Sequence, residues 1–239
     1  MSIAVCLGHE IMLRHDRWQN VIPLLGDSCV DMVLTDPPYS QVTHSGARTG
    51  HGDMELLSVE KGLFSSFDLD EQREWLSAVS RVSRRWVIAT MDFLHVVPLA
   101  ISPPSGLRFV RQGVWVKRGG APQFTGDRPA QGWEAIAMFH RDGEKLRWNG
   151  NGRSSVFVEG VERGEHPTTK PLKLWRLLVE LFSDPGDFIL DPFAGSGTTL
   201  LAAKETGRWA LGIEEQARWC DVAKRRLAQE MLFGARGNP

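Results

Sequence analysis

The stretch ILDPFAGSGTTLLAAKETGRWALGIEE, residues 189–215, constrains the fold more than any other part of this sequence. An apolar run enters Gly195-Ser196-Gly197, a helix-forming segment follows, and a second apolar run ends at Glu214. Glycines at a strand-to-helix turn let the backbone approach a ligand closely, and the start of the following helix is electropositive. A carboxylate that closes the next strand can accept hydrogen bonds from two ribose hydroxyls. The stretch therefore predicts a strand–helix–strand unit that binds a nucleoside-bearing ligand.

The glycine spacing excludes two common nucleotide-binding loops. A dinucleotide fingerprint needs G-x-G-x-x-G, but Leu200 occupies the position of the third glycine. A phosphate loop of the Walker type needs a Gly-Lys-Ser/Thr tripeptide, and none follows Gly197. S-Adenosylmethionine, which carries a ribose and no phosphate, is the nucleoside ligand that remains. On this motif alone, a tight turn without any ligand stays open.

Short apolar runs alternate with segments of helical period along the rest of the chain, which is typical of an α/β domain with a largely parallel sheet. We expect strands at residues 11–14, 30–35, 85–91, 113–117, 134–140, 187–191 and 208–214, and helices within 70–85, 170–182, 198–206 and 217–232. Asp68 and Glu71 are spaced for a capping box at the first of these helices. Residues 41–66 and 119–132 are predicted to be long loops.

Composition indicates a soluble globular protein, because 42% of the 239 residues are hydrophobic and 24% are charged. We expect one domain spanning residues 1–239, and a cytoplasmic protein without a membrane segment. Cys6, Cys29 and Cys220 form no C-x-x-C pair, so we expect neither a disulfide framework nor a bound metal. Residues 104–153 carry nine basic and four acidic side chains within a chain of net charge −1, which marks a basic region.

A second motif, Asp36-Pro37-Pro38-Tyr39, contains the only tyrosine of the chain. This tetrapeptide, followed far downstream by DPFAGSGTT at 191–199, resembles the amino-group DNA methyltransferases, which methylate adenine N6 or cytosine N4. The resemblance extends to 165–180, which is similar to the family's His-Pro-Thr-x-Lys-Pro segment over the cofactor, and to 212–227, where the family usually has an aromatic residue near Trp219.

The order of the motifs is that of the circularly permuted beta class, because the catalytic tetrapeptide precedes the cofactor loop. This resemblance implies an α/β, Rossmann-like fold of the S-adenosylmethionine-dependent methyltransferase type. The sheet would be doubly wound, mostly parallel and seven-stranded, with an antiparallel edge strand. Asp16 stands where the beta class places the aspartate that contacts the cofactor adenine, although His15 replaces the usual preceding glycine.

Carried onto this sequence, the resemblance implies S-adenosyl-L-methionine as the cofactor. The residues it implies for cofactor binding are Asp16, Asp36, Thr169, Lys170, Asp191, Phe193, Ala194, Gly195, Ser196, Gly197, Thr198 and Glu214. The catalytic residues it implies are Asp36, Pro37, Pro38 and Tyr39.

The tetrapeptide fits the chemistry of an exocyclic amino group, whose lone pair is delocalised into the ring. Two hydrogen-bond acceptors aimed at its protons, an Asp36 oxygen and the Pro37 carbonyl, would free that lone pair for the sulfonium methyl. Consecutive prolines hold this backbone extended. The base must first be flipped out of the duplex, and Tyr39 is placed to stack on it.

Double-stranded DNA is the expected partner. The predicted phosphate contacts are Arg48, Lys117, Arg118 and Arg128. Residues 41–66 are expected to be a DNA-contacting or mobile loop, and only 141–165 remain as a short target-recognition segment. We therefore expect a short or relaxed recognition sequence, or recognition supplied by the 41–66 loop or by the second subunit of a homodimer. The sequence does not indicate whether a restriction partner exists.

Asp at position 36 favours adenine N6, because the family's cytosine N4 enzymes more often show Ser-Pro-Pro-Tyr; N4 methylation stays open. Protein glutamine methyltransferases favour Asn at this position, whereas no residue excludes RNA as the substrate. An inactive binding module is expected to have lost Asp36, Tyr39 or the glycine loop, and this chain retains all three. A nicotinamide oxidoreductase is disfavoured by Leu200.

Overall fold

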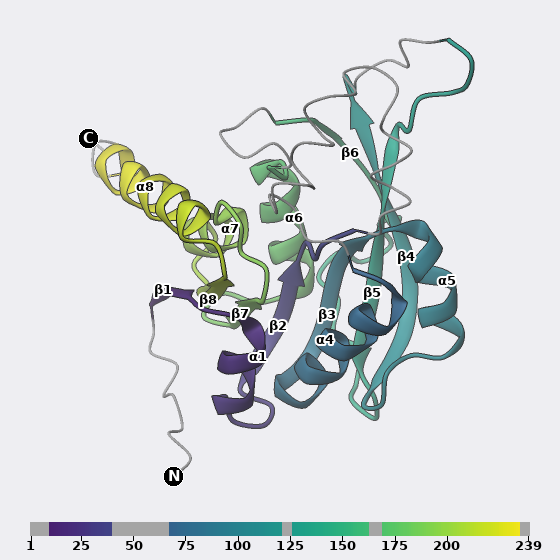
Figure 1. Ribbon diagram of the computed structural model, residues 1–239, viewed down its shortest axis with the longest axis horizontal. Coiled ribbons are helices and arrows are strands. Elements are labelled where there is room, and N and C mark those ends of the chain that lie inside the picture. The colour runs from purple at the N-terminus through teal and green to yellow at the C-terminus, as the bar shows by residue number, and fades with distance from the viewer. Residues whose placement is uncertain (1–9, 40–66, 121–125, 163–168, 235–239) are drawn as a thin grey trace.

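The computed structural model describes residues 10–39, 67–120, 126–162 and 169–234 (Figure 1). These residues form one eight-stranded sheet, whose strand order is β1-β8-β7-β2-β3-β5-β4-β6. The strands are β1 (Ile11–His15), β2 (Val30–Thr35), β3 (Ser83–Met91), β4 (Leu107–Arg118), β5 (Trp133–Arg141), β6 (Val156–Gly160), β7 (Phe188–Asp191) and β8 (Trp209–Glu214). The seven strands expected from the sequence are all present, and the doubly wound α/β architecture is confirmed.

Two details of the expected sheet are wrong. The sheet has an eighth strand, β6, which lies inside the segment expected to serve only for target recognition. The antiparallel strand is β5, and it lies between β3 and β4 instead of at an edge. The edge strand β6 pairs parallel with β4. Its five residues VFVEG bury only Phe157 well, so the apolar pattern was too weak to predict a strand.

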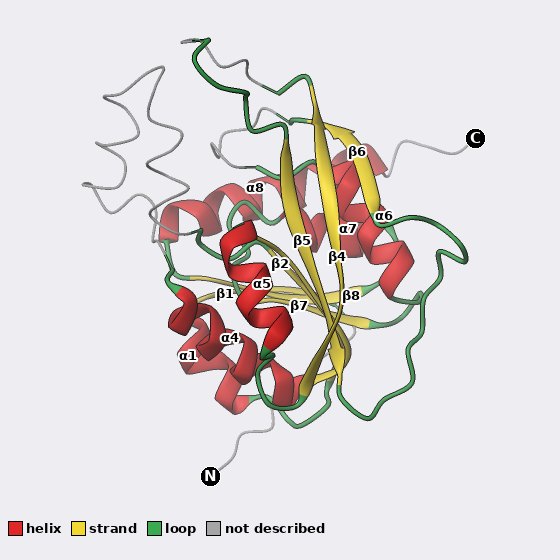
Figure 2. Ribbon diagram, turned by 90° about the vertical axis from the view of Figure 1, so that its right-hand side faces the viewer, coloured by secondary structure: helices red, strands yellow, loops and turns green. Residues whose placement is uncertain are grey.

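Helices cover both faces of the sheet (Figure 2). The described helices are α1 (Trp18–Val21), the 3₁₀ turn η1 (Ile22–Leu24), α4 (Leu69–Val82), α5 (Phe93–Ile101), α6 (Leu172–Phe182), α7 (Thr198–Glu205) and α8 (Ala217–Gly234). The capping box of α4 is confirmed, because Asp68 accepts a hydrogen bond from Glu71 N and Glu71 accepts one from Asp68 N. Helix α5 was not expected, since its nearly continuous apolar run, interrupted by Pro98, has no clear period.

Two hydrophobic clusters hold these layers together, because successive strand side chains point to opposite faces of the sheet. Val33 and Val87 pack with Trp75 and its neighbours on α4. Met32 and Ile88 pack on the other face, where α6 and α7 contribute the apolar side chains. No helix in the described ranges is long and apolar enough to cross a membrane.

The sheet topology brings the two motifs together. Strand β7 pairs with β8 on one side and with β2 on the other, and all three run parallel. The carboxyl ends of parallel strands meet at one edge of the sheet, and ligands of doubly wound folds bind outside that edge. The glycine loop follows β7 and the Asp-Pro-Pro-Tyr segment follows β2, so both motifs lie at this edge.

Candidate active site

A buried hydrogen bond connects the ends of the two motif strands. Thr35, the last residue of β2, donates its hydroxyl proton to Oδ1 of Asp191 at 2.6 Å. The same oxygen accepts the backbone N–H of Phe193 at 3.0 Å. Burial raises the pKa of Asp191 to about 6. Asp191, which was predicted to bind the cofactor, is only 3% exposed. It fixes the backbone that enters the glycine loop through its hydrogen bond from Phe193 N.

The glycine loop has two glycines with different surroundings. Both adopt left-handed backbone angles, with φ of +50° at Gly195 and +80° at Gly197. A Cβ on Gly197 would lie 2.9 Å from the Cβ of Ala223 on α8, so this glycine allows the helices to pack. A Cβ on Gly195 would meet no atom within 4 Å. Gly195 therefore faces open space, as a backbone that receives a ligand must.

Glu214, at the end of β8, binds the same loop from the side. Its Oε2 accepts the Gly195 N–H at 2.9 Å and its Oε1 accepts the Gln216 N–H at 2.8 Å. Burial raises the pKa of Glu214, although these backbone hydrogen bonds act in the opposite direction. Each carboxylate oxygen has a second lone pair, so two further hydrogen bonds can be accepted.

Asp16 follows β1 at the same edge, and its backbone N–H donates to the Glu214 carbonyl at 3.0 Å. Its exposed carboxylate accepts hydrogen bonds from Asn20 Nδ2 and Arg17 N, both at 2.8 Å, which lower its pKa. The structure thus brings Asp16, Glu214 and the glycine loop together at one edge of the sheet.

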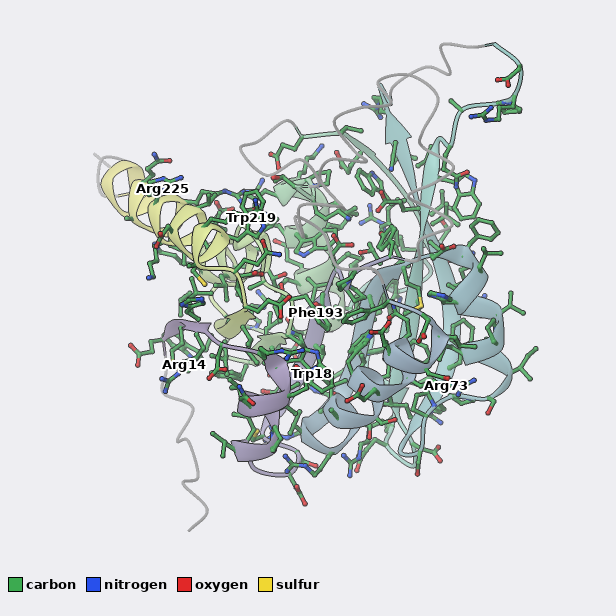
Figure 3. All side chains as sticks on the ribbon, in the orientation of Figure 1. Arg14, Trp18, Arg73, Phe193, Trp219 and Arg225 are labelled. Atoms are coloured by element: carbon green, nitrogen blue, oxygen red, sulfur yellow. The ribbon has the colours of Figure 1, made fainter. Side chains whose placement is uncertain are left out.

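The other predicted cofactor residues lie along the loop or beside it. Phe193 makes edge-to-face contacts with Phe67 and Trp75, with ring centroids 5.5 and 5.7 Å apart, and lies near the middle of the molecule (Figure 3). Ala194 N donates to the Ile213 carbonyl at 2.9 Å. Ser196, Thr198 and Thr169 are buried.

Sequence reasoning missed one residue that holds this loop, Arg226 on α8. Its Nη1 donates to the Ser196 carbonyl at 2.7 Å, to the Ser196 hydroxyl at 2.8 Å and to the Thr198 hydroxyl at 3.1 Å. Arginine is a common residue on the exposed face of a helix, so only the packing of α8 reveals this contact.

Asp36, the first residue of the second motif, is paired with Lys170. The Lys170 ammonium donates to Oδ2 of Asp36 at 2.5 Å, and the Thr90 hydroxyl at the end of β3 donates to Oδ1. Burial raises the pKa of Asp36, while the charge of Lys170 acts to lower it. Lys170 was predicted to bind the cofactor; the structure places its ammonium on the catalytic motif, where its side chain is only 8% exposed.

A second carboxylate, Glu134 at the start of β5, completes this cluster and was also missed. It accepts the Tyr39 hydroxyl at 2.9 Å and lies 3.5 Å from the Lys170 ammonium. Lys117 on β4 pairs with its other oxygen at 2.6 Å. Burial favours the neutral acid, but Lys170 and Lys117 together lower the pKa of Glu134. We call Asp36, Lys170, Glu134 and Lys117 the charge cluster.

Tyr39 lies against the charge cluster, with the Lys170 ammonium 5.3 Å from its ring centroid. Burial and the nearby carboxylates raise the pKa of Tyr39 well above its usual value, so its hydroxyl remains a donor. The Pro38 carbonyl accepts a hydrogen bond from Gln72 Nε2 at 2.9 Å, and Gln72 in turn accepts from Trp75 Nε1 at 2.7 Å. These buried contacts from α4 hold the prolines in place.

The predicted DNA contacts are not all alike. Lys117 is engaged in the charge cluster, so its charge is compensated by Glu134 instead of facing solvent freely. Arg118 is exposed at the end of β4, and the exposed Arg128 pairs with Asp127 at 2.9 Å. Arg48, the rest of the 41–66 loop and residues 166–168 of the His-Pro-Thr segment lie outside the described residues. The described part of the chain contains no group of His, Cys, Asp and Glu that could hold a metal.

Comparisons with known proteins identify the family of this chain. Residues 30–225 match the family model of N6 and N4 methyltransferases, described as DNA methylase. The chain is 26% identical to Type II methyltransferase M2.DpnII of Streptococcus pneumoniae, over 93% of this chain and 91% of that protein. It is 27% identical to Type II methyltransferase M2.LlaDCHI of Lactococcus lactis subsp. cremoris, over 95% of this chain and 92% of that protein. The crystal structure of the M1.HpyAVI–SAM complex shares the fold, with a TM-score of 0.69, 23% identity, and 90% and 99% of the two chains covered.

Proposed function

The chain belongs to the DNA methylase family of N6 and N4 methyltransferases, and we propose that it methylates the exocyclic N6 of an adenine flipped out of double-stranded DNA. The observation that carries this proposal is the position of Asp36. Its carboxylate lies at the carboxyl edge of the sheet, one strand away from the glycine loop, and its partner Lys170 lies 5.3 Å from the centroid of the Tyr39 ring. Such an arrangement suits an amino group that must meet a methyl donor.

The residues at the glycine loop fit S-adenosyl-L-methionine, the methyl donor of this family. The open side of Gly195 lets the backbone of the loop approach the cofactor closely. The Glu214 carboxylate beside it retains lone pairs that can accept hydrogen bonds from the ribose hydroxyls. Asp16, which follows the neighbouring strand β1, can accept a hydrogen bond from the amino group of the cofactor's adenine. Asp36, Phe193 and the buried Thr169 border the same region. When bound, the cofactor supplies an electrophilic methyl group on a sulfonium.

The chain's own residues activate the nucleophile. Oxygens of Asp36 and of the Pro37 carbonyl accept the two amino protons, which favours a pyramidal nitrogen with a free lone pair. Among the described residues, Gln72 occupies the Pro38 carbonyl and none donates to that of Pro37. The nitrogen forms its bond to carbon as the sulfur–carbon bond breaks, and the nitrogen then loses one proton, which the partly exposed carboxylate of Asp36 can accept. No covalent enzyme intermediate is needed.

Tyr39 stabilises the flipped base by stacking, which recovers about 1 to 3 kcal/mol of the cost of unstacking it. Glu134 holds its hydroxyl, Lys170 lies over its ring, and Phe67 N fixes its backbone by donating to the Tyr39 carbonyl. A preorganised ring loses little entropy when the base arrives.

Adenine is proposed over cytosine because of Asp36, since cytosine N4 enzymes of the family more often carry serine there. An acidic acceptor suits either amino group chemically, so product analysis decides between the two. Two relatives carry the name Type II methyltransferase, which supports a DNA substrate.

For DNA binding we propose contacts from the exposed Arg118 and Arg128 to phosphates, with Arg48 and the 41–66 loop as further candidates. The segment 141–165 remains the proposed target-recognition element, although β6 occupies part of it and ties it to the sheet. Because this segment has so few residues for recognising a DNA sequence, we propose a short recognition site, or recognition that is shared with a second subunit.

The test is direct. The protein is incubated with S-adenosylmethionine carrying a labelled methyl group and unmethylated double-stranded DNA, and the modified nucleoside is identified by mass spectrometry and located by sequencing. We expect N6-methyladenine in a short sequence context. N4-methylcytosine would replace the proposed base, and label on neither DNA base would overturn the function; RNA and protein are included as competing acceptors.

A further inference from the structure

Glu134 reaches the candidate active site by a route that no motif describes. It is the second residue of β5, the one strand of the sheet that runs antiparallel to its neighbours. Because β5 runs in the opposite direction, its amino end lies beside the carboxyl end of β3, where Met91 pairs with Ala135. The reversed strand therefore brings a carboxylate to the edge where the parallel strands end.

Glu134 contacts both lysines of the charge cluster and Tyr39. Three donors converge on its carboxylate: the Tyr39 hydroxyl at 2.9 Å, Lys117 at 2.6 Å and Lys170 at 3.5 Å. Its side chain is only 15% exposed. A charge taken out of water is retained only when it is paired and hydrogen-bonded, so these contacts are needed to compensate its desolvation.

Glu134 and Asp36 share one ammonium, that of Lys170. A cation between two carboxylates is restrained by both, so Glu134 limits how far Lys170 can move toward or away from Asp36. The same carboxylate restrains the Tyr39 ring through its hydroxyl. Glu134 thus acts on the acceptor Asp36 through Lys170 and contacts the stacking residue Tyr39 directly.

We propose that Glu134 is a positioning residue for methyl transfer, which sets the Asp36 carboxylate through Lys170 and the aromatic ring through the Tyr39 hydroxyl. This inference rests on the proposed function and deepens it. In this proposal Glu134 contacts neither the target nitrogen nor the methyl group. It positions the two side chains that contact the target base, Asp36 and Tyr39.

The cluster predicts a signature in the pH profile. The groups that face Asp36 are Lys170 ahead of α6, Glu134 on β5, Thr90 on β3, Asp191 on β7 and Tyr39 in its own segment. The negative charge of Glu134 raises the pKa of Asp36 and that of Lys170. Glu134→Gln removes this effect on both groups. The acidic limb of kcat/KM, which requires ionised Asp36, and the alkaline limb, which requires protonated Lys170, should then both move to lower pH.

The experiment compares Glu134→Gln, Glu134→Asp and the control Glu205→Gln with the parent protein. Glu205 on α7 also pairs with a cation, Arg176 at 2.7 Å, but lies outside the charge cluster. For each variant the kcat, the KM for DNA, the affinity for S-adenosylmethionine and the pH profile of kcat/KM are measured, and folding is checked by circular dichroism.

Glu134→Gln is expected to lower kcat about 10- to 100-fold, the range of a lost hydrogen bond to a charged group, and to move both limbs to lower pH. Cofactor affinity should stay near that of the parent, and Glu205→Gln should match the parent throughout. Glu134→Asp keeps the charge with a shorter reach, so kcat should fall while the limbs stay near their parent positions.

Parent-like kcat and unshifted limbs in Glu134→Gln would overturn the inference. If that variant does not fold, Glu134→Asp decides, because parent-like kcat there would show that the reach of this carboxylate does not matter. Failure of the proposed function is a separate result, seen when the parent protein itself transfers no methyl group to DNA.

Discussion

The ammonium of Lys170 lies 2.5 Å from Oδ2 of Asp36, although 134 positions separate the two residues in the sequence. Asp36 follows β2, and Lys170 immediately precedes Pro171, the N-cap of α6. Burial raises the pKa of this carboxyl, and the Lys170 charge favours its ionised form. Lys170 therefore stabilises the ionised form of a poorly solvated hydrogen-bond acceptor.

Asp36→Ala is expected to abolish methyl transfer while cofactor affinity stays within about an order of magnitude of the parent. The variant removes the side-chain acceptor, whereas Lys170 retains Glu134 as a counter-ion and the glycine loop is untouched. Radiolabel transfer to DNA and calorimetric titration with S-adenosylmethionine measure the two effects. Full turnover by Asp36→Ala would contradict the catalytic assignment.

Tyr39→Phe should retain much more activity than Tyr39→Ala, although it loses the hydrogen bond to Glu134 that orients the ring. Phenylalanine keeps the stacking face and loses only the hydroxyl donated to Glu134, which retains Lys117 and Lys170 as partners. Alanine loses the ring, so KM for DNA or kcat should worsen by the ~1 to 3 kcal/mol of base stacking, or roughly 5- to 150-fold. Steady-state kinetics on the same duplex distinguish the variants. Equal activity of Tyr39→Ala and the parent would disprove stacking.

The two glycines of the loop should respond differently to alanine. Both substitutions strain a left-handed backbone by about 1 kcal/mol. Gly197→Ala also forces a Cβ to 2.9 Å from Ala223, so we expect the larger loss of thermal stability there. Gly195→Ala meets no protein atom and should mainly weaken cofactor binding. Thermal unfolding with and without S-adenosylmethionine measures both quantities, and identical behaviour of the two variants would contradict this division of roles.

Arg226→Gln should weaken cofactor binding about tenfold, because the glycine loop loses several hydrogen bonds from one guanidinium. Arg225→Gln is the matched control, since it changes the charge of α8 equally at the exposed neighbouring position (Figure 3). Calorimetric titration of both variants gives the comparison. Equal affinities would show that α8 does not position the loop.

Asp191→Asn should change how stability depends on pH. The pKa of Asp191 is raised from 3.8 to about 6 by burial, so the folded protein binds more protons than the unfolded chain between these values. Stability from this group is therefore lost as pH rises through that window, by about 3 kcal/mol in all. The asparagine variant lacks this loss, so its stability relative to the parent should increase between pH 4 and pH 8. Urea unfolding at several pH values measures it, and a constant difference would count against a raised pKa.

Much of the fold follows from local pattern. The strands 30–35, 85–91, 134–140, 187–191 and 208–214 were predictable because strands buried on both faces of a sheet are short continuous apolar runs. The glycine loop and the Asp-Pro-Pro-Tyr segment were predictable because their chemistry is carried by adjacent residues. Strand β6 was not, since two of its three valine and phenylalanine side chains face outward.

The candidate site also has one part that the sequence predicts and another that it does not predict. The sequence by itself determined the two motifs, their order and the acidic residues that close the strands, because each depends on neighbours a few positions apart. Only the tertiary structure decided that Lys170 binds Asp36, that Arg226 holds the glycine loop and that Glu134 joins the charge cluster. The physical reason is that a buried charge is defined by its partners, and strand order and the reversed direction of β5 bring those partners from distant parts of the chain.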